Sequence, residues 1–235
     1  MNLENAFFIS SQNISKEKFV LNKSESNHAI RVLRLKKNQK LFLIDGKGIG
    51  YKAVIDNIDY DKVSGTITSK LVEYGEDNFS INIGFGLIKR DKLKILIEKC
   101  TELGVDSFQP LLLDRNIKKK INIERCKKII LASSKQCHRS RFPEIYKPKN
   151  LNDLMKSVNA KIIAASMEAN QSLSDINFKK GKSLILIIGP EGDFSNKEIE
   201  LLKENKVDMF NLGPRRLRSE TAAFKAISIL NNELS

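Results

Sequence analysis

Two short apolar runs near the C-terminal end, each closed by a Gly-Pro turn, constrain the fold of this 235-residue chain more than any other feature. The run 184–188 leads into the Gly-Pro-Glu-Gly turn 189–192, and the run 209–212 leads into the Gly-Pro pair 213–214. Each run has the length of a buried strand, and each turn precedes residues that begin helices. The sequence therefore predicts two strand-turn-helix units whose loops meet at the carboxyl edge of a parallel sheet, where α/β proteins bind ligands.

Helix-starting residues follow both turns. Ser195 and Glu198 have the spacing of a capping box. After the second turn, Ser219 or Thr221 can cap a helix, and Glu220 suits its positive end. Glycine leaves the backbone of such turns open to a flat ligand. One turn of this kind is common in any α/β protein, so the prediction of a site depends on the two together.

The pattern of strands and helices divides the chain into two expected domains, 1–72 and 73–235. The first holds short strands and one helix near 24–35, which favour a small β-barrel. The second alternates strands and helices, which predicts a parallel sheet covered by helices, an α/β fold. Its expected strands are 81–88, 108–112 and 161–165 in addition to the two runs above, and its further expected helices are one that ends at Gly104 and one over 122–137.

Positive charge is concentrated in one segment. The chain carries 41 Lys and Arg against 28 acidic residues, a formal charge of +13. Residues 115–149 contain twelve basic and two acidic residues, so this segment alone carries +10. Such a surface attracts nucleic-acid phosphates, although a solvated helix face in a lysine-rich protein would give the same pattern.

The sequence provides little indication of a disulfide-bonded secreted protein, a zinc protein or a membrane protein. Three cysteines, an odd number, and the lack of a signal-peptide pattern favour a reducing cytoplasm. Cys137-His138 has no second ligand pair at zinc spacing, so we expect no metal. No apolar run has the length of a membrane span.

Several segments together resemble one family. The two turn regions, 188–198 and 212–222, resemble the SPOUT methyltransferases, and within them the RsmE family. Three more segments are similar to motifs of that family: Glu98 to Val105, Gln136 to Ile145 and His28 to Arg34. The likeness covers most of the chain in one consistent order, which makes it far more specific than a single Gly-Pro-Glu-Gly turn.

The resemblance implies a fold, a reaction and partners. The implied fold is a SPOUT-type parallel-sheet domain with a C-terminal trefoil knot, preceded by a PUA-like β-barrel that helps to bind RNA. The implied reaction is S-adenosylmethionine-dependent methylation of N3 of a specific uridine in 16S ribosomal RNA, by a cytoplasmic homodimer acting on that RNA or on the small ribosomal subunit. The expected cofactor-binding residues are Ile188, Gly189, Pro190, Glu191, Gly192, Leu212, Gly213, Leu217 and Thr221, and the expected RNA-binding residues are Arg34, Lys118, Lys119, Lys120, Arg139, Arg141 and Arg215.

Three residues depart from the family pattern: Asp193, Arg216 and Lys135. Asp193 stands where glycine is usual, and we expect it to keep the turn because aspartate tolerates a left-handed backbone. Arg216 needs a polar partner if it points into the fold, and otherwise adds an exposed cation near the site.

Methylation of uracil N3 requires stabilisation of negative charge on the ring once the imide proton leaves. Arginine suits the uracil oxygens because it stays cationic and offers a planar fork of donors. We expect Arg218 to fill this catalytic role. The alternative is a structural ion pair of Arg218 with Glu220 or Glu191. Two other functions also stay open, a 2′-O-ribose RNA methyltransferase of the same fold and a non-catalytic RNA-binding module.

Overall fold

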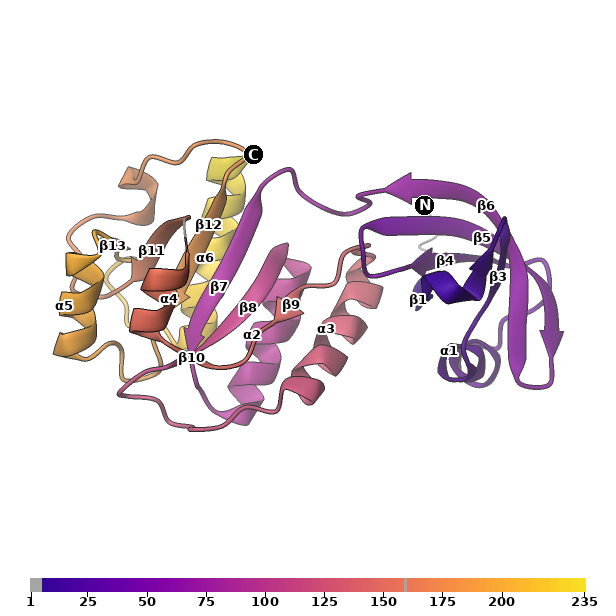
Figure 1. Ribbon diagram of the computed structural model, residues 1–235, viewed down its shortest axis with the longest axis horizontal. Helices are drawn as coiled ribbons and strands as arrows, with labels where there is room; N and C mark the ends of the chain where they lie inside the picture. The colour runs from indigo at the N-terminus through magenta and orange to yellow at the C-terminus, as the bar shows by residue number, and fades with distance from the viewer. Residues whose placement is uncertain (1–5, 159) are drawn as a thin grey trace. The chain divides into compact units, whose positions relative to one another are not determined.

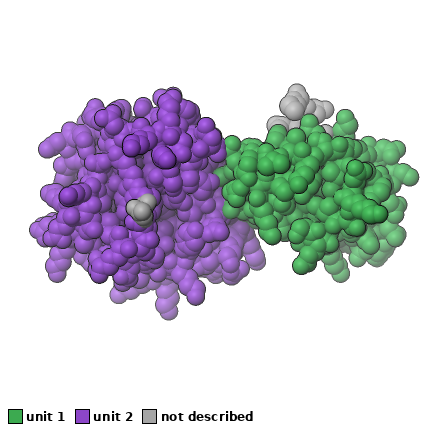
Figure 2. Space-filling model, turned by 45° about the horizontal axis from the view of Figure 1, so that its top comes forward, with its two compact units in different colours: residues 1–76, 131–142 green, residues 77–130, 143–235 purple. Residues whose placement is uncertain are grey.

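The computed structural model describes residues 6–158 and 160–235, and the chain divides into two compact units, coloured separately in Figure 2. Unit 1 comprises residues up to 76 together with 131–142, and unit 2 comprises residues 77–130 and 143–235. The sequence placed 131–142 in the second domain, whereas in the structure this segment returns to the first unit. Within the described ranges, no helix combines the length and the apolar character required to cross a bilayer.

Unit 1 is built on a six-stranded sheet in the order β1-β4-β5-β6-β3-β2, with β1 and β2 at its ends. Figure 1 shows how this sheet curls. Its pairs are antiparallel except for β1 with β4. The long hairpin of β5 and β6 alternates buried and exposed residues, as expected for a sheet with one face on the core. The elements are β1 (Ala6–Phe8), η1 (Ser11–Asn13), β2 (Ile14–Ser15), β3 (Lys18–Val20), α1 (Lys23–Asn27), the π-helical segment η2 (His28–Val32), β4 (Lys40–Ile44), β5 (Ile49–Asp59) and β6 (Lys62–Val72).

The segment 131–142 is held in unit 1 by polar and aromatic contacts. The ammonium of Lys135 lies 2.7 Å from a carboxylate oxygen of Glu25, whose side chain is 9% exposed. The Phe142 ring packs on Phe8 with a centroid distance of 5.5 Å. Lys135, one of the departures from the family pattern, therefore has a partner within its own unit.

Unit 2 is built on a seven-stranded parallel sheet, ordered β10-β8-β7-β12-β11-β13 with β9 paired to β8. Strand β12 is buried along five of its six residues because helices cover both faces of the sheet. The elements are β7 (Ser80–Gly86), α2 (Arg90–Glu102), β8 (Val105–Leu112), α3 (Ile123–Cys137), which ends in unit 1, β9 (Glu144–Ile145), β10 (Lys149–Asn150), α4 (Leu151–Ser157), β11 (Lys161–Ala165), η3 (Leu173–Asp175), β12 (Ser183–Ile188), α5 (Asn196–Glu204), β13 (Asp208–Phe210) and α6 (Ser219–Leu234).

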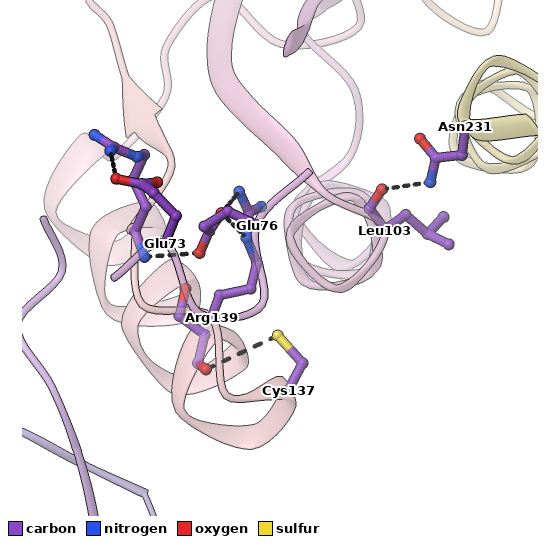
Figure 3. Close-up of polar contacts among 8 residues, drawn as sticks. Glu73, Glu76, Leu103, Cys137, Arg139 and Asn231 are labelled. Carbon is purple, nitrogen blue, oxygen red and sulfur yellow. Dashed lines mark hydrogen bonds and ion pairs between the residues drawn. The ribbon is translucent and has the colours of Figure 1, made fainter. Parts of the chain in front are cut away.

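The two faces of this sheet carry different helices. Ile185 and Ile187 join a core cluster with residues of α4 and α5, whereas α6 packs with β12 and with α2 (Figure 1). Adjacent helices α2 and α6 are also tied by a hydrogen bond from Asn231 Nδ2 to Leu103 O, 2.9 Å (Figure 3). A parallel sheet between two helix layers leaves its carboxyl edge free for loops.

Three strands end side by side at that carboxyl edge. The register pairs Ala165 of β11 with Ile188 of β12 on one side and with Phe210 of β13 on the other. The loops that follow these strands therefore begin next to one another, although the three segments are well separated in the sequence.

Candidate functional site

The three loops at the carboxyl edge enclose a pocket within unit 2. The loop after β12 supplies one wall, the loop between β13 and α6 supplies the second, and the residues that follow β11 supply the third. The pocket is lined by Ala165, Ser166, Met167, Ile188, Gly189, Pro190, Glu191, Asp193, Leu212, Gly213, Arg215, Arg216, Leu217, Ser219 and Ala222.

The first turn is compact and packs directly on the neighbouring strand end. A Cβ on Gly189 would lie 3.1 Å from Asp193 Oδ1, and a Cβ on Gly86, at the end of β7, would lie 2.7 Å from Pro190 N. Asp193 has a positive φ of 60°, and its amide donates to Pro190 O at 2.9 Å. The expectation that aspartate keeps the turn is confirmed, because its backbone is left-handed.

The second turn depends on a glycine conformation. Gly213 has a φ of 99°, and its amide donates to Asn211 Oδ1 at 3.1 Å. The Lys225 ammonium on α6 donates to Leu212 O at 2.7 Å, which fixes the turn against the following helix. Among the described residues other than its chain neighbours, a Cβ built on Gly213 would meet Lys225 Nζ alone within 4 Å, at 3.8 Å. The glycine is required here by the backbone angle rather than by lack of space.

Ser219 joins the two turns rather than capping its own helix. Its hydroxyl donates to Gly189 O at 2.9 Å, from the first residue of α6. The N-cap residue of α6 is Arg218, which makes no side-chain capping bond. The prediction that Ser219 or Thr221 caps this helix was therefore wrong, because the serine hydroxyl stabilises the neighbouring turn instead.

One carboxylate in the pocket wall lacks a partner. Glu191 Oε2 is buried and has no hydrogen-bond partner among the described residues. The backbone carbonyl of the same residue accepts from Arg216 Nη2 at 3.0 Å, so Arg216 lies exposed over the turn and has the polar partner it needs. A buried, unpaired carboxylate oxygen favours a ligand with a positive charge or a hydrogen-bond donor at this wall.

Arg218 lies between two pocket-lining residues, Leu217 and Ser219, and its own side chain is exposed. Neither of the ion pairs considered for it is present among the described residues. Glu220 lies instead 3.3 Å from Lys92 Nζ, and the buried oxygen of Glu191 has no partner. Arg218 itself does not line the pocket, and no carboxylate among the described residues pairs with its guanidinium.

The pocket contains most of the predicted cofactor-binding residues but not all of them. Gly192 and Thr221 lie outside the lining, and a Cβ on Gly192 would instead meet the Arg115 side chain at 3.1 Å. Sequence reasoning missed the third wall, 165–167. The apolar run 161–165 could have predicted this wall. This run forms a strand parallel to its two neighbours, and parallel strands of one sheet end at the same edge.

The predicted RNA-binding residues are divided between the units. In unit 2, Arg215 lines the pocket, and Lys118, Lys119 and Lys120 are exposed in the loop after β8. In unit 1, Arg34 is exposed, and Arg141 is 47% exposed with its guanidinium on Glu73.

Arg139 differs from the other predicted RNA-binding residues because it is buried. Its side chain is 5% exposed, and Nη2 and Nε donate to Glu76 Oε2 at 2.7 and 3.1 Å (Figure 3). The other oxygen of Glu76 accepts from the backbone amide of Arg141 at 2.8 Å. This geometry leaves Arg139 no accessible face for a phosphate, so we assign it to holding unit 1 together.

The glycine at 213 gives a direct test of the pocket. The sequence resemblance implies that the pocket binds S-adenosylmethionine. Gly213→Ala should weaken this binding by about tenfold, because an alanine at a positive φ costs about 1–3 kcal/mol of strain and displaces the turn. Gly181→Ala is the matched control, since Gly181 has a φ of 67° and also has space for a Cβ. Calorimetric titration of both variants checks this, and equal affinities would remove the second turn from the site.

Comparison with known proteins shows similarity to RNA methyltransferases over both units. A family model described as an RNA methyltransferase domain matches residues 75–231, and an RNA methyltransferase PUA domain model matches residues 21–68. The ribosomal RNA small subunit methyltransferase E of Rickettsia conorii is 31% identical over 230 residues, which covers 95% of this chain and 93% of that protein.

Solved structures share the whole architecture. A methyltransferase from Legionella pneumophila, determined with bound S-adenosylmethionine, superimposes with a TM-score of 0.87 and 26% identity over 97% of each chain. The ribosomal RNA small subunit methyltransferase E of Neisseria gonorrhoeae, also bound to S-adenosylmethionine, gives a TM-score of 0.89 over 97% of each chain at 23% identity, which supports the fold. With a parallel-sheet domain, a PUA domain and a glycine-lined pocket at the sheet edge, this chain belongs to the ribosomal RNA small subunit methyltransferase E family.

Proposed function

We propose that this protein transfers a methyl group from S-adenosylmethionine to N3 of a specific uridine in 16S ribosomal RNA. The observation that carries the proposal is the pocket of three loops, two of them glycine-bearing turns. Arg218, which has no ion-pair partner among the described residues, lies in the chain between the lining residues Leu217 and Ser219. Family membership supplies the reaction class, and the basic surface of the chain suits an RNA substrate.

The residues of the pocket fit the methyl donor, which supplies an electrophilic methyl group on a sulfonium centre when bound. Ile188, Leu212 and Leu217 offer apolar surface for a flat ring, and the backbone of the two turns offers polar groups beside it. The buried Glu191 Oε2 matches a cationic group of the donor. Binding apolar and cationic parts of one ligand in fixed positions is the main task of such a site.

Arg218 acts on the second substrate, the uracil base, by stabilising negative charge on its ring. N3 of uracil becomes nucleophilic when its imide proton leaves, and the resulting negative charge spreads to the two ring oxygens. The exposed guanidinium of Arg218 can donate to such an oxygen with a planar pair of N–H groups. Because this interaction strengthens as charge develops, it accelerates the reaction rather than only binding the base.

We further propose that the active form is a homodimer and that the C-terminal part of the sheet, with α6, forms a trefoil knot. Both follow from the family resemblance of the turn segments. A hydrogen bond from the Ser219 hydroxyl to Gly189 O joins the start of α6 to the first turn. This contact is compatible with a C-terminal end threaded beside that turn.

Donor binding and methyl transfer can be measured separately on the full chain. Calorimetry should show binding of S-adenosylmethionine, and labelled donor should transfer its methyl group to unmodified small-subunit RNA. RNA binding without donor binding would favour a non-catalytic RNA-binding module that lacks a donor pocket. That result, or donor binding without transfer to the RNA or to the assembled subunit, would overturn the proposal.

A further inference from the structure

A second cavity of unit 2, here called the basic cleft, has a volume of about 400 Å³. It lies between the start of α2, the start of α3 and the loop 113–122 that joins β8 to α3. The cleft is lined by Ile88, Arg90, Leu93, Lys94, Lys118, Lys120, Ile121, Asn122, Arg125, Cys126 and Ile129. Its volume lies within the range of about 300–1,000 Å³ that is usual for small-ligand sites.

The charge of the basic cleft is not compensated. Five of its eleven lining side chains are cationic and none is acidic. Among the described residues, no carboxylate pairs with Arg125, and its Nη1 is buried without a hydrogen-bond partner. Two other cations of the same helices that do not line the cleft are paired: Lys127 lies 2.8 Å from Glu124, and Lys92 lies 3.3 Å from Glu220. Cations collected around a concave surface and left unpaired favour an anionic ligand.

The floor of the cleft is apolar and contains no aromatic side chain. Ile88 and Cys126 are each 2% exposed, and Leu93, Ile121 and Ile129 complete this surface. Burial raises the pKa of the Cys126 thiol to about 11, so it stays neutral at pH 7 and does not offset the positive charge. Without an aromatic ring for base stacking, the floor suits the sugar of a nucleotide more than a stacked base.

The loop 113–122 connects the basic cleft with the first turn of the pocket. The amide of Lys118 donates to Leu87 O at 3.3 Å, which places the loop 113–122 beside the residues that follow β7. The same loop reaches the first turn of the pocket, because Arg115 Nη1 donates to Gly192 O at 2.9 Å. One loop therefore forms a wall of the basic cleft and holds the turn that lines the pocket.

We propose that the basic cleft holds one phosphate and ribose of single-stranded RNA, from a nucleotide close to the methylated uridine. This inference rests on the proposed function, because it takes RNA as the substrate of the neighbouring pocket. A duplex is too wide to enter such a cavity, and the apolar floor beside the cations matches a sugar attached to its phosphate. The contacts involve no base edge, so binding should tolerate any base at this position.

Charge removal inside and outside the cleft tests the proposal. The probe is a fluorescently labelled single-stranded RNA of eight nucleotides, titrated with the full chain at several salt concentrations. Lys118→Gln and Arg125→Gln should each raise the Kd by about fivefold to tenfold, and each should lower the log-log salt slope by about one unit. Lys118 is exposed, so its replacement does not depend on tolerance of the core.

Lys128→Gln is the matched control. Lys128 lies on the same helix as Arg125, is exposed, and does not line the cleft. This variant loses the same formal charge and should change the Kd by less than about twofold. Equal losses in all three variants would indicate a diffuse electrostatic field and would overturn the proposal. Unchanged RNA affinity with altered sedimentation in the cleft variants would identify a contact between copies of this chain, which also contradicts it.

Failure of this inference is distinct from failure of the proposed function. Donor affinity should stay at the wild-type value in Lys118→Gln and Arg125→Gln, because neither residue lines the pocket. If wild-type protein methylates its RNA while the cleft variants bind the probe normally, only the cleft assignment is wrong. If wild-type protein neither binds the donor nor transfers a methyl group, the proposed function is wrong.

Discussion

Arg218→Ala should lower the single-turnover rate of methyl transfer by about a hundredfold or more, with less than about a twofold change in donor affinity. The guanidinium is exposed, has no ion-pair partner among the described residues, and lies between two residues that line the pocket. Its interaction with uracil strengthens only as negative charge develops, so its loss affects the rate more than the bound ground state.

A conservative variant separates charge from geometry at this position. Arg218→Lys keeps a positive charge but loses the planar fork, so it should recover only part of the rate. Single-turnover methylation and donor titration are measured on the same folded protein. A rate close to wild type in Arg218→Ala would exclude the catalytic role, and parallel losses of stability, donor binding and rate would identify a structural strut.

Arg139→Ala should lower the stability of unit 1 by about 3–5 kcal/mol, because it leaves the Glu76 carboxylate buried without its charged partner. The two side chains are each 5% exposed and share two hydrogen bonds. The neighbouring pair of Arg141 with Glu73 is about half exposed, so Arg141→Ala should cost about 1 kcal/mol or less. Two similar ion pairs, two residues apart, are expected to differ because only one is buried.

Hydrogen exchange read by mass spectrometry suits this comparison, because the chain contains no tryptophan for fluorescence. Peptides from β4, β5 and β6 should exchange much faster in Arg139→Ala than in Arg141→Ala, while peptides from β12 should change little. Similar protection in the two variants would contradict the structural role given to the buried pair. It would reopen the assignment of Arg139 to RNA binding.

Local sequence patterns predicted the parts of the fold that depend on neighbouring residues. The run 161–165 became β11 with the expected bounds, and Ser195 with Glu198 forms the expected capping box. The backbone of Gly213 and Asp193 is left-handed, as their turns require. Periodicity and capping spacing were sufficient to identify the strand and the capping box, because each is determined within a few residues. The expectation for Asp193 came from the family resemblance, and the backbone angle of Gly213 was not predicted.

Features that depend on distant contacts were not predicted from the sequence. The segment 131–142 reads as the end of a helix in the second domain, yet Lys135 and Arg139 find their carboxylate partners far back in the chain, at Glu25 and Glu76. In the same way, serine is a residue type that often caps helices, but the Ser219 hydroxyl donates a hydrogen bond to the backbone oxygen of Gly189, thirty residues earlier. Charge and capping residues indicate that a partner is needed without indicating which one.

The most direct test of the central claim is nucleoside mass spectrometry of 16S ribosomal RNA after reaction with the purified protein and S-adenosylmethionine. The substrate is RNA or small subunits from cells that lack the enzyme, and Arg218→Ala serves as the inactive control. We predict one added 3-methyluridine per RNA in the wild-type reaction and almost none in the control. A methyl group on the ribose 2′-oxygen, or no methylated uridine at all, would contradict the assignment.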